Sequence, residues 1–175
     1  MTREQFEHAI RAVGGVLGVG ELLIIGSQAL HASVTVDVPA EAMRSIEVDV
    51  AVIHDLDGRL ADLIDGSIGE GSMFHDTFGY YAQGVVETTA VLPSGWRERL
   101  IRFETAATNG VVAWCLEVHD LWLSKAVAGR QKDIEFCQAL LDRMLVDRGR
   151  LRDRLDMMGA LDDRVRAAVG ARIGR

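Results

Sequence analysis

Residues 22–30, Leu-Leu-Ile-Ile-Gly-Ser-Gln-Ala-Leu, hold the first feature that decides the fold. The four apolar residues 22–25 are typical of a short buried strand, and Gly26 ends that run. Ser27 is a suitable N-cap for a helix that follows. A glycine at such a junction lets the backbone approach a phosphate, and the first N–H groups of the helix point toward it. Gly26 and Ser27 therefore form a candidate phosphate-binding turn, although strand–Gly–Ser–helix junctions are also common in proteins that bind no phosphate.

The next predicted strand, residues 46–53 (IEVDVAVI), carries two carboxylates. Glu47 and Asp49 are two positions apart, and alternate residues of a strand point to the same face. The apolar residues around them indicate a largely buried strand, where neighbouring carboxylates are unfavourable unless a cation joins them. Mg²⁺ prefers oxygen ligands and often shares one or two carboxylates with substrate phosphates. Glu47 and Asp49 are therefore candidate metal ligands, and a Lys or Arg partner is the alternative.

Three cations lie close together later in the chain: Lys125, Arg130 and Lys132. They fall at the end of one predicted helix, near Gly129, and at the start of the next. A lysine supplies a point charge and an arginine a fork of donors, so the group could clamp a triphosphate. Ordinary surface charge on two helices is the alternative interpretation. Asp133 falls in the first turn of the second helix, where the helix dipole favours an acid in any case.

The remaining pattern predicts an α+β fold with one mixed β-sheet, helices packed mainly on one side and a helical C-terminal extension. Thr2 and Gln5 fit a capping box at the start of a first helix. Strands are predicted at 74–81, 85–92, 99–103 and 111–116, the last two forming a hairpin around Asn109-Gly110. Further helices are predicted at about 55–65, 120–128 and 132–146, with one more in the tail. The predicted boundary separates residues 1–145 from an Arg-rich extension, 146–175.

Composition and charge restrict the function classes. The chain has 175 residues and a formal net charge of −7, but residues 1–145 carry −10 and residues 146–175 carry +3. An acidic body does not suit a protein whose main task is to grip nucleic acid through phosphates, although the Arg-rich tail could form a local RNA-binding patch. A solvated helix with Arg–Asp pairs is the alternative for the tail. No apolar run is long enough to span a membrane, and Cys115 and Cys137 fit no disulfide or metal pattern, so we expect a cytoplasmic protein.

The order of these motifs resembles a known superfamily. Gly26-Ser27 followed by Glu47-x-Asp49 on the next strand resembles the signature of the polymerase-β-like nucleotidyltransferases. Ser124-Lys125 and Lys132-Asp133 resemble later motifs of the AbiEii/MenA-like branch, which is found in toxin–antitoxin and phage-defence systems. The resemblance spans roughly residues 20–143, and the combination of motifs is more specific than any one of them.

The resemblance implies a nucleotidyltransferase fold and a reaction. A nucleoside monophosphate would pass from an NTP to an acceptor, with Mg²⁺ as cofactor and pyrophosphate leaving; in the toxin branch the acceptor is typically RNA, often the 3′ end of tRNA, and a cognate antitoxin is a partner. The implied phosphate-binding residues are Gly26, Ser27, Arg130 and Lys132. The implied catalytic residues are Glu47 and Asp49, which would bind the metal, Lys125, which would contact phosphate, and Asp133, which would complete the site.

Two departures from the family pattern keep a second interpretation open. The first metal ligand is usually Asp, and its replacement by Glu47 moves the carboxylate by about 1 Å or more. The gap between Gly26-Ser27 and Glu47 is also longer than in the minimal enzymes of the family. In addition, a third acidic ligand cannot be assigned among Asp76, Glu87 and Glu104. The alternative to an enzyme is therefore a catalytically degenerate nucleotidyltransferase fold that binds a nucleotide or a protein partner. It predicts the same fold with separated carboxylates or a filled pocket.

Overall fold

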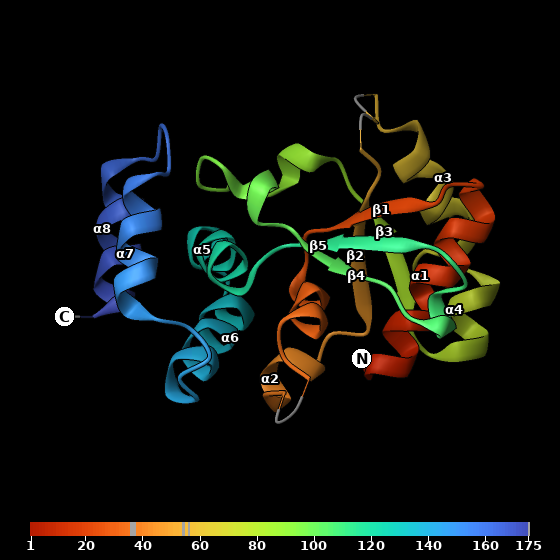
Figure 1. Cartoon of the computed structure of the whole chain (residues 1–175), viewed down its shortest axis with the longest axis horizontal. Helices are drawn as coiled ribbons and strands as arrows, with labels where there is room; N and C mark the ends of the chain where they lie inside the picture. The colour runs from red at the N-terminus through yellow and green to blue at the C-terminus, as the bar shows by residue number, and fades with distance from the viewer. Residues whose placement is uncertain (36–37, 54, 56, 175) are drawn as a thin grey trace.

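A five-stranded mixed sheet forms the centre of the computed structural model, which describes residues 1–35, 38–53, 55 and 57–174 (Figure 1). Its strands are β1 (Glu21–Ile24), β2 (Glu47–Ala51), β3 (Tyr81–Gly84), β4 (Ile101–Phe103) and β5 (Val112–Cys115). They lie in the order β3-β2-β1-β5-β4. β1 is parallel to β5 and β2 to β3, whereas β1–β2 and β4–β5 are antiparallel. The mixed α+β fold predicted from the sequence is confirmed.

The helices form two groups at opposite ends of the molecule (Figure 1). α1 (Arg3–Leu17), α3 (Arg59–Ile68) and α4 (Met73–Phe78) pack against the sheet. The C-terminal helices mainly contact one another and the 3₁₀ turn η1 (Ser27–Ala32), which lies between them and the strands. They are α5 (Val118–Ala128), α6 (Gln131–Asp142), α7 (Arg148–Asp156) and α8 (Asp163–Ile173). A short helix, α2 (Ala40–Met43), contacts η1 and α6.

α1 follows its predicted pattern. The Thr2–Gln5 capping box is present, and the helix ends at Gly18, whose φ of 66° is left-handed. Its apolar residues Phe6, Ile10 and Val13 are fully buried. No helix among the described residues is long and apolar enough to cross a membrane.

The prediction for residues 74–92 is wrong in most positions. Residues 74–78 are helical, because Ser72 caps α4 through its side chain and Gly79 ends it with a φ of 75°. Residues 85–92 contain only the 3₁₀ turn η2 (Glu87–Thr89) rather than a strand. The one strand of this region, β3, lies between the two predicted ones. Aromatic and β-branched residues favoured a strand here, but the local caps decide the conformation.

Other boundaries also move. α3 begins at Arg59 rather than near residue 55. The Asp55 carboxylate accepts hydrogen bonds from the backbone N–H groups of Leu60 and Ala61, each at 3.0 Å. Leu56, which belongs to the predicted start of this helix, lies outside the described residues. β4 and β5 pair as predicted, but a further 3₁₀ turn, η4 (Ala106–Thr108), precedes Asn109 and lengthens the connection. The tail contains two helices, α7 and α8, where one was predicted.

Candidate functional site

Gly26 and Asp49 meet where β1 ends. β1 pairs with β2, and the Ile25 N–H donates to the Asp49 carbonyl at 3.3 Å, so Gly26 lies beside Asp49. A Cβ atom on Gly26 would lie 1.7 Å from Asp49 Oδ2. Gly26 therefore provides the space that the Asp49 carboxylate occupies. Its φ of −91° is open to any residue, so the glycine is needed for space and not for conformation.

Ser27 differs from its predicted role as the N-cap of an α-helix. The N-cap position belongs to Gly26, which has no side chain to cap with, and Ser27 begins the six-residue 3₁₀ turn η1. Such a short turn has a smaller dipole than an α-helix, which weakens the argument for phosphate binding by the backbone alone. The side chain of Ser27 is half-buried and lines the cleft described below.

The Asp49 carboxylate is half-buried and electrostatically unfavourable. Burial raises its pKa above the ordinary value, Lys125 opposes that shift, and Glu47 adds to it. Among the described residues, this carboxylate forms no hydrogen bond or ion pair, and its oxygens keep some contact with solvent. An acid that is desolvated without a partner is typical of a position that a ligand completes.

Glu47 lies on the same face of β2 but already has two partners. Its Oε2 accepts the Tyr81 hydroxyl at 3.1 Å, and its Oε1 lies 3.3 Å from Lys132 Nζ. Burial, followed by the charge of Glu47, raises the pKa of Tyr81 to about 12, so the phenol stays protonated and donates. The β2–β3 register explains the contact, because Tyr81 is paired with Glu47 and Gln83 with Asp49.

Asp133 holds two of the predicted cations. It is 2% exposed. Arg130 donates to both of its oxygens, with Nε–Oδ2 at 2.6 Å and Nη2–Oδ1 at 3.2 Å. Lys125 Nζ lies 3.7 Å from Oδ1. The carboxylate therefore fixes Arg130 and Lys125 next to each other.

The relative position of α5 and α6 is set by one reciprocal contact. Trp122 Nε1 donates to the Cys137 carbonyl at 2.9 Å, and Cys137 Sγ lies 3.4 Å from the Trp122 carbonyl. Both residues are buried. Lys125 follows Trp122 by one turn and Asp133 precedes Cys137 by one turn, so this contact determines how the two charged side chains meet.

Two adjacent cavities contain the predicted residues. One, of about 260 Å³, is lined among others by Ser27, Glu47, Lys125, Lys132 and Asp133. The other, of about 230 Å³, is lined by Asp49, Lys125 and Arg130, with the uncharged polar side chains of Gln83 and Ser124. Lys125 lines both. The structure thus brings all eight predicted site residues into one region, with the two carboxylates opening into different cavities.

A divalent cation fits this donor set only in part. Within the described ranges, no group of three or more His, Cys, Asp or Glu side chains could hold a metal ion. Glu87 and Glu104 pair with Arg97 and Arg102, and Asp76 is in α4. Glu47 and Asp49 can supply only part of a metal's ligands, so a Mg²⁺ ion bound here would need its other ligands from water and a substrate.

Sequence reasoning missed the two β3 neighbours of the carboxylates, Tyr81 and Gln83. Both could have been found if β3 had been placed correctly, since alternate residues of a paired strand must lie beside positions 47 and 49. The misplaced strands at 74–81 and 85–92 concealed that pairing.

The comparisons with known proteins identify the family of the chain. A family model described as "Nucleotidyltransferase of unknown function (DUF6036)" matches residues 5–168, which include every residue of the site. The AbiEii/MenA-like branch is not identified by that match. No curated protein and no solved structure matches the chain.

Proposed function

The chain belongs to this family of nucleotidyltransferases, and from that premise we propose that it transfers a nucleoside monophosphate from an NTP to an acceptor hydroxyl, with pyrophosphate leaving. The observation that carries the proposal is the Asp49 carboxylate. It is half-buried, its pKa is raised by burial, and it forms no hydrogen bond among the described residues; it fills the space beside Gly26 and shares a cavity with Lys125 and Arg130.

The charges around Asp49 suit a metal-bound triphosphate. Asp49 and Glu47 would hold Mg²⁺, which when bound neutralises phosphate charge and polarises the reacting phosphorus. Lys125 and Arg130, fixed by Asp133, would bind phosphate oxygens on the other side. Catalysis would come mainly from positioning and electrostatic stabilisation.

Glu47 has to exchange a partner for this to happen. Its Lys132 contact is a surface ion pair, in which the Lys132 side chain is 63% exposed. Such pairs contribute little to stability, about 0 to 1 kcal/mol, so a cation can displace Lys132 at small cost. Lys132 would then be available to a phosphate in the same cavity.

The test is transfer of label from each α-³²P NTP with Mg²⁺ and total bacterial RNA. The Glu47→Ala/Asp49→Ala double variant removes both proposed ligands, and Asp153→Asn, an exposed carboxylate of α7, is the matched control. Label that appears with wild type and Asp153→Asn but not with the double variant supports the enzyme. Absence of label on RNA and on the protein itself contradicts it.

A non-enzymatic nucleotide-binding module is the second candidate. The observations that favour it are that both Glu47 oxygens already have partners and that no group of three or more His, Cys, Asp or Glu side chains among the described residues could hold a metal ion. Calorimetry with Mg²⁺ and each NTP separates the two candidates. Binding that depends on Asp49 without any transfer would identify the module.

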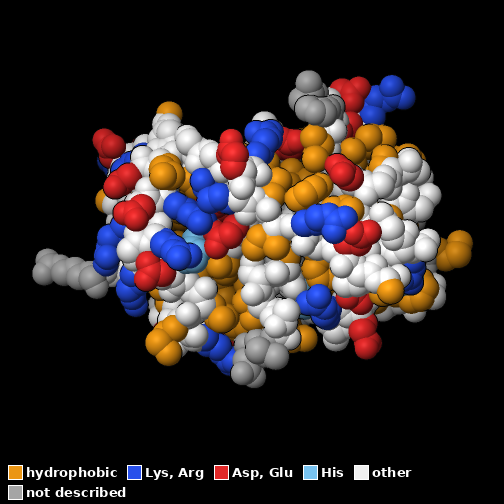
Figure 2. Space-filling view, in the orientation of Figure 1, with side chains coloured by type: hydrophobic (Ala, Val, Ile, Leu, Met, Phe, Trp, Pro, Cys, Tyr) orange, Lys and Arg blue, Asp and Glu red, His pale blue; other side chains and the backbone are white. Residues whose placement is uncertain are grey.

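An RNA acceptor, tRNA in particular, and a toxin role are finer proposals. Three tail arginines already use part of their donors on backbone carbonyls: Arg152, Arg166 and Arg172. On the face drawn in Figure 2, Lys/Arg and Asp/Glu side chains are also intermingled over the C-terminal helices. If RNA is the acceptor, labelling should therefore fall only moderately between 50 and 200 mM salt.

The toxin role has a test of its own. Expression of the wild-type protein should arrest growth, and expression of Asp49→Asn should not.

A further inference from the structure

α5 determines where the two phosphate-facing cations lie. Lys125 is in its last turn, and Arg130 follows Gly129, which ends the helix with a left-handed φ of 65°. The C-terminal helices α7 and α8 both pack against α5 and against each other. The tail that follows the candidate site in sequence is therefore in contact with the helix that carries it.

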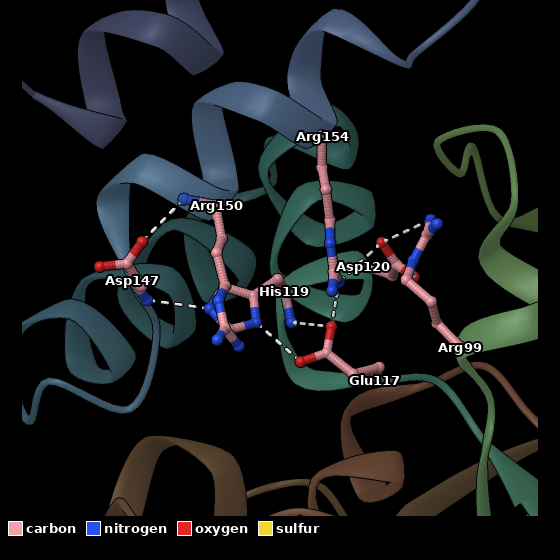
Figure 3. Close-up of polar contacts among 7 residues, drawn as sticks. All are labelled: Arg99, Glu117, His119, Asp120, Asp147, Arg150 and Arg154. Carbon is pink, nitrogen blue, oxygen red and sulfur yellow. Dashed lines mark hydrogen bonds and ion pairs between the residues drawn. The ribbon is translucent and has the colours of Figure 1, made fainter.

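The N-terminal end of α5 is tied to α7 by a buried polar network (Figure 3). Arg154 of α7 donates to Glu117 and, at 3.0 Å, to Asp120. Asp120 is fully buried and also binds Arg99 at 2.8 Å. His119 completes the network, with its two ring nitrogens on Glu117, at 2.7 Å, and on the Asp147 N–H, at 2.9 Å.

The C-terminal end of α5 is tied to α8 by one arginine. Arg172 Nη1 donates to the Ala126 carbonyl at 2.9 Å. Ala126 is the neighbour of Lys125, and its carbonyl is among the last four of α5, which lack the usual helical partner. A cation here also interacts favourably with the negative end of the helix dipole. The same guanidinium lies beside Gly129, 4.0 Å from where a Cβ would be.

We propose that Arg172 is a positioning residue for the phosphate cations, and this rests on the proposed function. By holding the Ala126 carbonyl in the last turn of α5, it keeps Lys125 and the Gly129–Arg130 turn directed into the two cavities. Arg172 itself lines neither cavity. A displacement of about 1 Å in a group that binds the transferred phosphate is enough to lower the rate or affinity strongly.

The experiment compares Arg172→Ala and Arg172→Lys in the full chain. The control is Arg164→Ala, which removes an exposed arginine from the same helix. Steady-state kinetics gives KM for the NTP and kcat, and hydrogen exchange reports the amides of residues 126–130. We expect Arg172→Ala to raise KM roughly tenfold, the effect of one lost charge-assisted hydrogen bond, with kcat changed less than about threefold. Exchange at 126–130 should accelerate, and Arg172→Lys should restore both values in large part.

Three results would overturn the proposal. The first is an unchanged KM with unchanged exchange at 126–130. The second is a loss of active protein with normal KM, which would make Arg172 merely structural. The third is equal behaviour of Arg164→Ala. If Arg172→Ala does not fold, Arg172→Gln, which keeps a donor without the charge, decides by the same KM criterion.

Failure of the proposed function gives a different result. Wild-type protein would then transfer no nucleotide, so no KM could be compared. Hydrogen exchange at the amides of residues 126–130 would then be the only measurement. Accelerated exchange confined to 126–130 in Arg172→Ala, and normal in Arg164→Ala, would still support the positioning of this turn. Unchanged exchange would overturn it.

Discussion

The Asp49 carboxylate occupies the space at the end of β1 where a side chain on residue 26 would lie. Any side chain on Gly26 must displace the Asp49 carboxylate, since even a Cβ would lie 1.7 Å from Oδ2. The sequence motif Gly-Ser therefore has a meaning here that phosphate binding alone does not give. The glycine is required by an acid 23 positions later in the chain.

We expect Gly26→Ala to lower transfer activity about 100-fold, because it moves the carboxylate away from the reacting phosphate. It should also destabilise the protein by about 1 to 3 kcal/mol through overpacking. Gly15→Ala is the control, because a Cβ at that exposed helical position meets nothing within 4 Å. The cause is checked in an Asp49→Ala background. In that background, Gly26→Ala should lower the transfer activity little further. A further loss of about 100-fold would show that Gly26 does not act through the Asp49 carboxylate.

Asp49 should show a trade-off between stability and function. Burial raises its pKa, so the folded state holds the proton more strongly than the unfolded state, and stability is lost as the pH rises from 3.8 through the folded pKa. Asp49→Asn removes this cost and should melt at a higher temperature than wild type at pH 7, with the difference vanishing below pH 3.8. Mg²⁺ with an NTP should raise the melting temperature of the wild type only. A variant that is no more stable at pH 7 would contradict the unfavourable ionised state.

At the scale of elements, α5 and α6 form one unit that presents the cations. Trp122 and Cys137 fix the helices to each other, and Asp133 joins their charged ends. Ordinary helix rules explain the acid at position 133 equally well, so sequence alone could not decide its role. The structure gives it a partner on each helix.

Asp133→Asn should leave Lys125 and Arg130 without their shared counter-charge. We expect kcat to fall at least tenfold and the free energy of unfolding to fall by about 2 kcal/mol, since hydrogen bonds between charged groups are worth roughly that much. Asp142→Asn, an exposed carboxylate of the same helix, is the matched control. Rates within twofold of wild type would mean that the two cations need no fixed position.

The success of sequence reasoning also varies by element. β1, β2, α1, α5 and the start of α6 were predictable, because each has a clear apolar run or helical period with a recognisable end. Residues 74–92 were not, since the caps at Ser72 and Gly79 override an aromatic pattern that suggests strands. The error concealed Tyr81 and Gln83, so the site was predicted from its charged residues and not from their neighbours.

At the scale of the whole molecule, long-range polar contacts bind the C-terminal extension to the body. Three arginines of the tail are partners for acids or helix-end carbonyls of other elements: Arg154, Arg166 and Arg172. No sequence pattern indicates such pairs, because the partners belong to different elements and are 11 to 46 residues apart. Local charge counts left open a basic patch or a helix with Arg–Asp pairs, and they could not show which acids and carbonyls the arginines contact.

That network should make the docking of the extension sensitive to acid. Burial alone would raise the pKa of Glu117, but hydrogen bonds from His119 and Arg154 outweigh it and lower the pKa to about 2. The ionised carboxylate is thus favoured in the folded state, and its stabilisation is complete above pH 4.5 and lost as the pH falls toward 2. Glu117→Gln should melt at a lower temperature than wild type at pH 7, with the gap closing between pH 4.5 and 2. Glu98→Gln, a carboxylate outside the network, should show no such convergence. A gap that stays constant over this range would mean that the charge of Glu117 does not hold the extension in place, and that apolar packing of α7 and α8 on α5 is sufficient.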